Sequence, residues 1–357
     1  MKLGIVASNA ISPSSFYRAF GALTYLAREH SIELMVSEVW DWARLMYCDA
    51  LFMHCPMSRE HVALAELARQ TRTPVWVDHD DLVTSLGRDN SGYTSIMRAD
   101  VQTNIRRCMD LAAVVTVSTP ELEKRLCPGA TVIPNALNDY LGGREERGER
   151  REQRKVVTWR GGPAHYSDQE TFGPAVGRVA RDFPDWEFHF LGCAHWSLEG
   201  LMPKGSLVVH EWQDVLSYAE VLRELKPAVH IVPMVPTAFN LCKSNCAWLE
   251  ATAAGAVTLA PAWGEFMRPG IVNYAGGKSG VSGLKSKVQS PGEVISEQAG
   301  VNNFVNNFER ALGAVLGADS DVLGRAVQES RGFIEGHLLL SKVNKQRMAV
   351  LVTSRPR

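Results

Sequence analysis

The stretch from Phe239 to Pro261, FNLCKSNCAWLEATAAGAVTLAP, predicts a ligand-facing loop, a helix and a buried strand in immediate succession. Asn240 or Ser244 can cap the helix, and the run of alanine and leucine that follows favours helical structure. Gly255 stands where a left-handed residue ends such a helix, and residues 256–260 then form an apolar strand. We expect the rest of the chain to be organised around this stretch.

Lys243 and Glu250 carry the charges of the predicted helix. They are seven residues apart, which places both side chains on one helical face and about 10 Å apart along its axis. That separation matches the length of a sugar diphosphate. A cation in the first turn suits a phosphate, and a carboxylate can accept hydrogen bonds from ribose hydroxyls. A surface helix with a solvated lysine and glutamate explains the same spacing.

Length and composition restrict the class of protein. The chain has 357 residues, more than one hydrophobic core usually serves, so we expect two domains. Its 38 basic and 39 acidic residues give a net charge of −1, which excludes a global attraction to nucleic acid or to an anionic membrane. No apolar run approaches the roughly 20 residues of a membrane span, and the opening MKLGIVASN lacks the apolar core of a signal peptide. These features predict a cytoplasmic protein.

The seven cysteines include no CxxC pair. Cys242 and Cys246 flank the predicted helix without the further His or Cys partners that a zinc site needs. Buried, reduced thiols are the expectation.

The first half of the chain alternates short apolar strands with helices. This alternation predicts a parallel sheet covered on both faces, and so a Rossmann-like unit. The expected strands are residues 3–7, 32–36, 50–54, 74–78 and 113–118, and the expected helices include residues 16–27, 60–70 and 96–111.

Polar side chains follow three of these strands, at the edge of the sheet where ligands gather in such folds. They are the turn 8–15, His54, and the run 78–81, DHDD. The carboxylates of Asp78, Asp80 and Asp81 can bind a metal or an acceptor hydroxyl, or act as a base, and a helix cap with a turn explains them as well. His54 alone fits a core histidine better than a catalytic one, and Arg18 fits an ion pair better than a phosphate contact.

Residues 144–155, REERGERREQRK, separate the two halves. They contain six basic and four acidic residues and no large apolar one, which predicts a solvated linker or an exposed helix. We therefore expect an N-terminal acceptor domain over 1–143, a second domain over 156–335, and a C-terminal helix over 336–357. Binding of nucleic acid is an alternative role for the linker, although its four glutamates reduce its net positive charge.

The second half restarts the alternation with a strand over 156–159, followed by the segment RGGPAH, residues 160–165. Glycines between a strand and a helix let the backbone approach a phosphate and direct N–H groups at it, and an ordinary tight turn explains two glycines as well. Residues 263–300 are rich in glycine and predict irregular loops that line a cleft. Further strands are expected at 187–191, 207–210 and 229–233, and helices at 168–183 and 215–225.

Five motifs in this order resemble those of the GT-B nucleotide-sugar glycosyltransferases, particularly the retaining group, which includes bacterial and bacteriophage enzymes. The resemblance covers the whole chain and rests on SPSSFYRAFGAL, VWVDHDDL, VSTPELEKRL followed by VIPNAL, TWRGGPAHYSD, and FNLCKSNCAWLEATAAGAV. It implies an α/β fold with two Rossmann-like domains, whose parallel sheets face a cleft. The second domain would hold a nucleotide-sugar donor as co-substrate, with no other cofactor and no metal.

The resemblance also implies site residues. Glu250 matches the ribose-binding glutamate of the family, Gly161 and Gly162 match the loop near the diphosphate, and Arg160 or Lys243 would neutralise it. Many relatives have a sugar-contacting glutamate at the position of Cys242, so this difference leaves the donor sugar open. The expected donor-binding residues are Gly161, Gly162, His165, Lys243, Ser244 and Glu250, and the expected catalytic residues are Arg160, Lys243, Asp78, Asp80 and Asp81.

The activity implied is transfer of a sugar from a nucleoside diphosphate to an acceptor hydroxyl, with retention of configuration and with cations that stabilise the departing diphosphate. Two alternatives remain. One is a phage-type enzyme that glycosylates a hydroxymethylated base in DNA, with residues 144–155 on the phosphates. The other is a non-catalytic nucleotide-sugar-binding protein, which Cys242 suggests.

Overall fold

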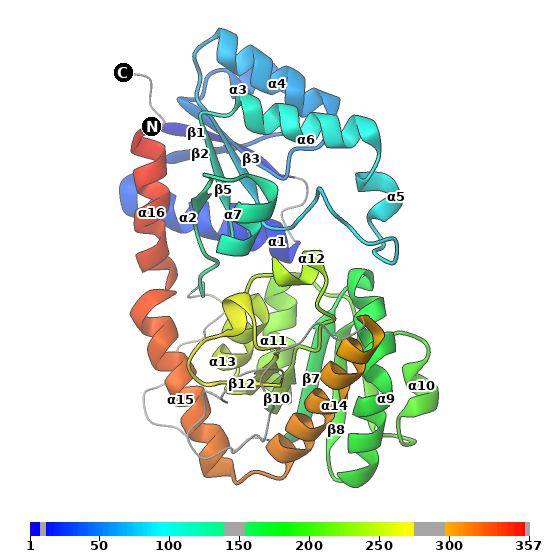
Figure 1. Cartoon of the computed structure of the whole chain (residues 1–357). Coiled ribbons are helices and arrows are strands. Elements are labelled where there is room, and N and C mark those ends of the chain that lie inside the picture. The colour runs from blue at the N-terminus through cyan, green and yellow to red at the C-terminus, as the bar shows by residue number, and fades with distance from the viewer. Residues whose placement is uncertain (8–11, 139–153, 275–296, 354–357) are drawn as a thin grey trace.

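The structure is a computed structural model, and it describes residues 1–7, 12–138, 154–274 and 297–353. Its strands form two six-stranded sheets, and every strand pairing within them is parallel. The first sheet with its helices lies above the second in Figure 1. This architecture confirms the predicted α/β class with two parallel sheets. No helix in the described part of the chain has the length and apolar character needed to cross a membrane.

The first sheet has the strand order β2-β1-β3-β4-β5-β6. The order reverses between β1 and β3, and ligands of such sheets bind beyond the carboxyl ends of the strands at a reversal of this kind. The strands are β1 (Lys2–Val6), β2 (Glu33–Val36), β3 (Ala50–His54), β4 (Val75–His79), β5 (Val114–Val117) and β6 (Thr131–Val132). The helices are α1 (Pro13–Ser15), a π-helical turn (Phe16–Phe20), α2 (Gly21–His30), α3 (Trp42–Leu45), α4 (Arg59–Gln70), α5 (Tyr93–Ile96), α6 (Ala99–Leu111) and α7 (Pro120–Leu126).

The second sheet has the order β9-β8-β7-β10-β11-β12, which reverses between β7 and β10. Its strands are β7 (Arg154–Gly161), β8 (Glu187–Gly192), β9 (Leu207–Glu211), β10 (Pro227–Ile231), β11 (Val257–Ala260) and β12 (Ile271–Asn273). Its helices are α9 (Tyr166–Asp182), α10 (Leu198–Leu201), α11 (Val215–Leu225), α12 (Ala238–Leu241), α13 (Cys246–Ala253), α14 (Glu297–Leu316) and α15 (Ser320–His337), with 3₁₀ turns at Pro163–His165 and Gly264–Phe266.

The central strands are buried because helices cover both faces of each sheet. Every residue of β3, β4 and β10 is buried, as a parallel sheet between two helical layers requires. Side-chain caps set the helix starts between them: Thr119 accepts a hydrogen bond from the Leu122 backbone N–H at 3.1 Å, and Pro120 occupies the first turn of α7.

The predicted helix is wrong if it starts at Asn240, because that stretch forms two helices, whereas a start at Ser244 comes within two residues of the first residue of α13. Thr237 caps α12 through the Asn240 backbone N–H at 3.1 Å, and α13 begins after Asn245. Lys243 therefore lies in the turn between the helices, and the two-turn helical spacing from Lys243 to Glu250 does not exist. A threonine cap placed earlier and three polar residues in succession compete with a continuous helix.

Two other predicted segments differ from the structure. Residues 264–273 contain a 3₁₀ turn and strand β12 where irregular loops are predicted, and residues 275–296 lie outside the described residues. Of the linker predicted over 144–155, residues 144–153 also lie outside the described residues. Its last two residues instead open β7, where the Arg154 backbone N–H donates to the Lys226 carbonyl at 3.0 Å.

Helix α16 (Leu340–Thr353) returns from the second unit to the first and packs against α2 (Figure 1). The Asn344 side-chain amide donates to the Ala22 carbonyl at 3.1 Å. One buried apolar cluster contains Leu3 and Ala22 of the first unit together with Trp248 and Val343. Apolar packing therefore joins the two sheets and holds their carboxyl edges toward each other.

Candidate active site

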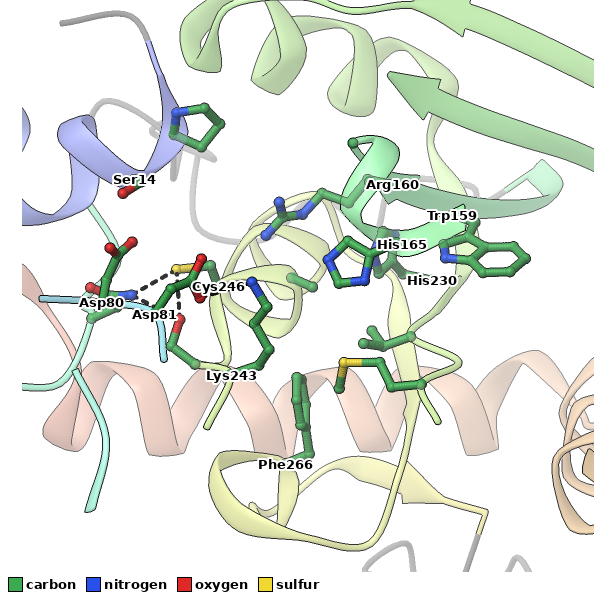
Figure 2. Close-up of a pocket in the computed structure, with 18 of the residues that line it drawn as sticks. Ser14, Asp80, Asp81, Trp159, Arg160, His165, His230, Lys243, Cys246 and Phe266 are labelled. Carbon is green, nitrogen blue, oxygen red and sulfur yellow. Dashed lines mark hydrogen bonds and ion pairs between the residues drawn. The ribbon is translucent and has the colours of Figure 1, made fainter. Parts of the chain in front are cut away.

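A pocket of about 210 Å³ lies between the carboxyl edges of the two sheets. Figure 2 shows Ser14, Asp80 and Asp81 of the first unit on one side, Arg160, His165 and His230 of the second on the other, and Lys243 between them. A smaller pocket of about 90 Å³ shares Arg160 and the two glycines with it and extends to Trp212 and Glu250. The larger pocket lies at the reversal of strand order between β7 and β10, where α/β folds bind ligands, and the smaller one lies beyond the ends of β7, β8 and β9.

Gly161 ends β7 and Gly162 follows it, directly before the turn that leads into α9. Gly162 has φ −91° and ψ −177°, an extended conformation that any residue adopts. A Cβ atom on Gly162 would meet no atom within 4 Å. The protein itself therefore does not require glycine here, whereas a ligand close to this backbone would.

Arg160, which is partly exposed and lines both pockets, forms an ion pair with the buried Glu250. The Arg160 Nε and Glu250 Oε2 atoms lie 2.7 Å apart, and the Tyr17 hydroxyl donates to Glu250 Oε1 at 2.9 Å. Burial raises the pKa of Glu250, although Arg160 and the hydrogen bond from Tyr17 act to lower it. The pKa of Arg160 is above its ordinary value, because the charge of Glu250 outweighs the effect of burial. Glu250 Oε2 accepts no directed hydrogen bond from the described residues.

Lys243 reaches across to the first unit. Its Nζ atom donates to Asp81 Oδ1 at 2.8 Å and lies 4.1 Å from the centre of the Phe239 ring. Ser244 also contacts the first unit, because its Oγ accepts from the Asn135 side-chain amide at 2.9 Å. The turn between α12 and α13 thus brings both predicted residues to the pocket from a direction that a single helix would not allow.

His165 is oriented by Asp168 in the first turn of α9. Its Nδ1 atom lies 2.9 Å from Asp168 Oδ2, and Asp168 Oδ1 accepts from the Val235 backbone N–H at 2.7 Å and the Asn240 amide at 3.0 Å. The carboxylate is 1% exposed. Asp168 therefore connects the turn at 161–165 to the loop after β10, and these two segments form two sides of the pocket.

The run 78–81 divides between the pocket and the core. Asp80 and Asp81 line the pocket, and Asp78 does not. Asp78 is 1% exposed, and its two oxygens accept from Arg18 Nε at 2.8 Å and Nη2 at 2.7 Å. Asp78 therefore cannot contact a ligand in the pocket, and its role in the structure is to bind the Arg18 side chain.

The sequence-predicted donor residues are brought together, in two pockets. Gly161, Gly162, His165, Lys243 and Ser244 line the larger one together with Arg160, and Glu250 lines the smaller one. Their roles stay predictions. Cys242 lines neither pocket: it is 1% exposed and packs in an apolar cluster with Leu122 of the first unit.

His230 and Tyr17 are pocket residues that the sequence patterns did not single out. His230 lies in β10, its Nδ1 atom lies 2.8 Å from Thr158 Oγ1, and its Nε2 atom has no hydrogen-bond partner among the described residues. Burial, together with the charge of Arg160, lowers the pKa of His230 to about 3. The sequence could have indicated His230, because it is a histidine within an otherwise apolar predicted strand. Nothing in the spacing of Tyr17 and Glu250 predicts their contact.

Comparison with solved structures defines the fold as GT-B. Neither a known sequence family nor a curated protein sequence matches the chain. A glycosyltransferase from Rickettsia africae superposes with a TM-score of 0.57 at 10% identity, over 98% of this chain and 97% of that one.

Two further structures share the fold. The pneumococcal O-GlcNAc transferase GtfA, in complex with UDP and GlcNAc, matches with a TM-score of 0.56 and 12% identity, over 89% of this chain and 60% of that one. A candidate UDP-N-acetylglucosamine 2-epimerase from Listeria monocytogenes matches with a TM-score of 0.50 and 10% identity, over 92% and 91% of the two chains. At these identities the likeness concerns the fold alone.

Proposed function

We propose that this protein transfers a sugar from a nucleoside diphosphate donor to a hydroxyl acceptor. The observation that carries the proposal is the pocket between the sheets. There the Gly161–Gly162 turn and Arg160 of the second unit face the carboxylates Asp80 and Asp81 of the first. A donor on one wall and an acceptor on the other is the arrangement that group transfer needs, because it places two reactants side by side.

The donor fits across both pockets. Trp212, 54% exposed at the smaller pocket, offers a ring on which a base can stack, and Glu250, which lines the same pocket, is the carboxylate that we assign to a ribose hydroxyl. The glycine turn with Arg160 and Lys243 suits the diphosphate. The UDP and GlcNAc in the GtfA complex favour a uridine diphosphate sugar for this chain as well.

Arg160 and Lys243 would stabilise the charge that develops on the departing diphosphate. We propose retention of configuration: the acceptor hydroxyl attacks on the face that the diphosphate leaves, and a diphosphate oxygen takes its proton. Two carboxylates near the pocket already have cationic partners, since Asp81 pairs with Lys243 and Asp78 with Arg18. This pairing argues against either as a covalent nucleophile.

A thermal-shift screen against nucleoside diphosphates and their sugars tests the donor site, because a ligand that binds only the native state raises the melting temperature. We expect a selective shift that Glu250→Gln abolishes. Glu265→Gln is the matched control, since Glu265 is also buried and paired with an arginine, Arg268, at 2.7 Å, and it lines neither pocket. An equal shift in wild type and Glu250→Gln would exclude the donor placement.

Product analysis separates the remaining possibilities. NMR of a reaction with one donor and a panel of hydroxyl acceptors should show a new glycoside with the anomeric configuration of the donor. Isomerised donor without an acceptor would indicate an epimerase, which the fold also serves in the Listeria structure. Donor binding without turnover would indicate a nucleotide-sugar-binding protein. Salt-dependent binding of duplex DNA would point to a hydroxymethylated base as acceptor, with a role for residues 144–153, which lie outside the described structure.

A further inference from the structure

Three side chains of metal-binding type meet next to the larger pocket, which Asp80 lines and His54 and Cys55 do not. The atoms His54 Nε2, Cys55 Sγ and Asp80 Oδ1 form a triangle with edges of 3.5 Å (N to S), 3.3 Å (S to O) and 3.3 Å (N to O). The group lies at the carboxyl ends of β3 and β4, next to the reversal of strand order in the first sheet. The sequence does not reveal this group as a metal-binding motif, because Asp80 lies 25 residues after Cys55.

The size of this triangle is that of three corners of a tetrahedral metal site. Zinc bonds to sulfur, nitrogen and oxygen of about 2.0–2.3 Å at tetrahedral angles place neighbouring ligand atoms about 3.3–3.6 Å apart. All three observed edges fall in or at this range. The distances between the three atoms are therefore those that a zinc ion bound by all of them requires.

The backbone holds the group in place. The Cys55 backbone N–H donates to the Asp78 carbonyl at 2.8 Å, and Cys55 has φ 47°, a left-handed conformation that is unfavourable for a non-glycine residue. His54 is 2% exposed, and its Nδ1 atom lies 3.4 Å from Ser15 Oγ. A hydrogen bond at Nδ1 leaves Nε2 as the ligand atom, as the outer partners of metal-bound histidines generally do.

We propose that His54, Cys55 and Asp80 bind one divalent cation of the zinc class, with the fourth position open to the pocket. Zinc accepts thiolate, imidazole and carboxylate together, whereas magnesium and calcium prefer oxygen. Ser14 is the neighbour on the pocket side, because its Oγ lies 3.3 Å from His54 Nε2 and it lines the pocket. A neutral hydroxyl is a weak ligand, so water or a substrate hydroxyl can take this place.

An open metal position at the acceptor wall would bind and polarise a hydroxyl group, which is the acceptor class of the transfer proposed above. This role rests on the proposed function. The metal site itself does not, because its ligands and geometry belong to the first unit alone.

Cobalt(II) titration of the metal-free protein tests the site without donor or acceptor. We expect one equivalent to bind with tetrahedral d–d bands and a thiolate-to-cobalt charge-transfer band, and zinc to displace it. Cys55→Ser should abolish the charge-transfer band and weaken binding more than about tenfold, and Asp80→Asn should weaken binding while it keeps the band. Cys127→Ser, also half-buried but outside the triangle, should behave as wild type.

A second measurement uses the unaltered protein, in case a substitution prevents folding. Zinc should protect Cys55 from alkylation, as peptide mass spectrometry reports, and leave the alkylation of Cys127 unchanged. Absence of stoichiometric binding, a charge-transfer band that survives in Cys55→Ser, or equal alkylation of Cys55 with and without zinc would each overturn the proposal. Failure of sugar transfer would leave these readouts unaffected and would count against the proposed function only.

Discussion

Gly162 is a residue whose own surroundings do not require glycine. Its extended backbone accepts any side chain, and a Cβ there would meet no protein atom within 4 Å. We predict that Gly162→Ala folds with wild-type stability and loses the thermal shift with nucleoside diphosphates, because the methyl group occupies the space that a phosphate needs. Gly324→Ala, whose Cβ is equally unobstructed in α15, is the control. An unchanged shift in Gly162→Ala would place the diphosphate elsewhere.

His230 makes the stability of the protein sensitive to acid. Burial lowers its pKa to about 3 from an ordinary value of 6.5, so below pH 6.5 the unfolded chain binds a proton that the native protein does not. The contribution of the neutral His230 ring to the free energy of unfolding is fully present above pH 6.5 and is lost as the pH falls toward 3. Between pH 7 and 4.5 this costs about 2–3 kcal/mol.

We therefore expect the unfolding free energy of His230→Asn, from urea denaturation, to fall about 2–3 kcal/mol less than that of wild type over the same interval. Replacement of the exposed His337 controls for the loss of a histidine. Parallel pH curves for His230→Asn and wild type would contradict the buried, neutral state of the ring.

At the scale of elements, Asp168 connects the first turn of α9 to the loop between β10 and α12. Its removal in Asp168→Ala leaves the Val235 N–H and one N–H of the Asn240 amide without their buried acceptor, and an unpaired buried group costs about 1–3 kcal/mol. We predict a loss of about 3 kcal/mol in urea denaturation and faster hydrogen exchange at the Val235 amide. Asp185→Ala, at an exposed carboxylate, should change neither. Unaltered exchange at Val235 would show that the loop is held by other contacts.

At the scale of the whole molecule, the Lys243–Asp81 ion pair joins the two units across the pocket. Both side chains are partly exposed, so the pair is worth at most about 1 kcal/mol to stability. We predict that Asp81→Asn leaves the melting temperature nearly unchanged and tightens donor binding, since Lys243 is no longer shared with a carboxylate. Lys243→Ala should slow transfer.

Asp100→Asn removes an exposed carboxylate of a comparable surface pair with Arg98 and serves as the control for Asp81→Asn in calorimetric titration with the donor. Equal donor affinity in wild type and Asp81→Asn would mean that Lys243 does not contact the diphosphate.

Much of the fold was predictable because strands and helices follow local patterns. The apolar runs at 50–54 and 187–191 correspond to β3 and β8 within one residue, and residues 215–225 correspond to α11. The break between α12 and α13 was not predictable from the same run of residues, because Thr237 supplies a cap upstream of it. Partners outside the run decide such boundaries.

By itself the sequence determined the alternation of strands and helices, the two parallel sheets and the glycine turn after β7, because these depend on residues close together in the chain. Only the tertiary structure decided which side chains meet. It paired Glu250 with Arg160 and Tyr17, withdrew Asp78 from the pocket, and placed His54 and Cys55 beside Asp80. These contacts join residues that are distant in sequence, and they exist because strand order and the packing of the two units bring the carboxyl edges of the sheets together.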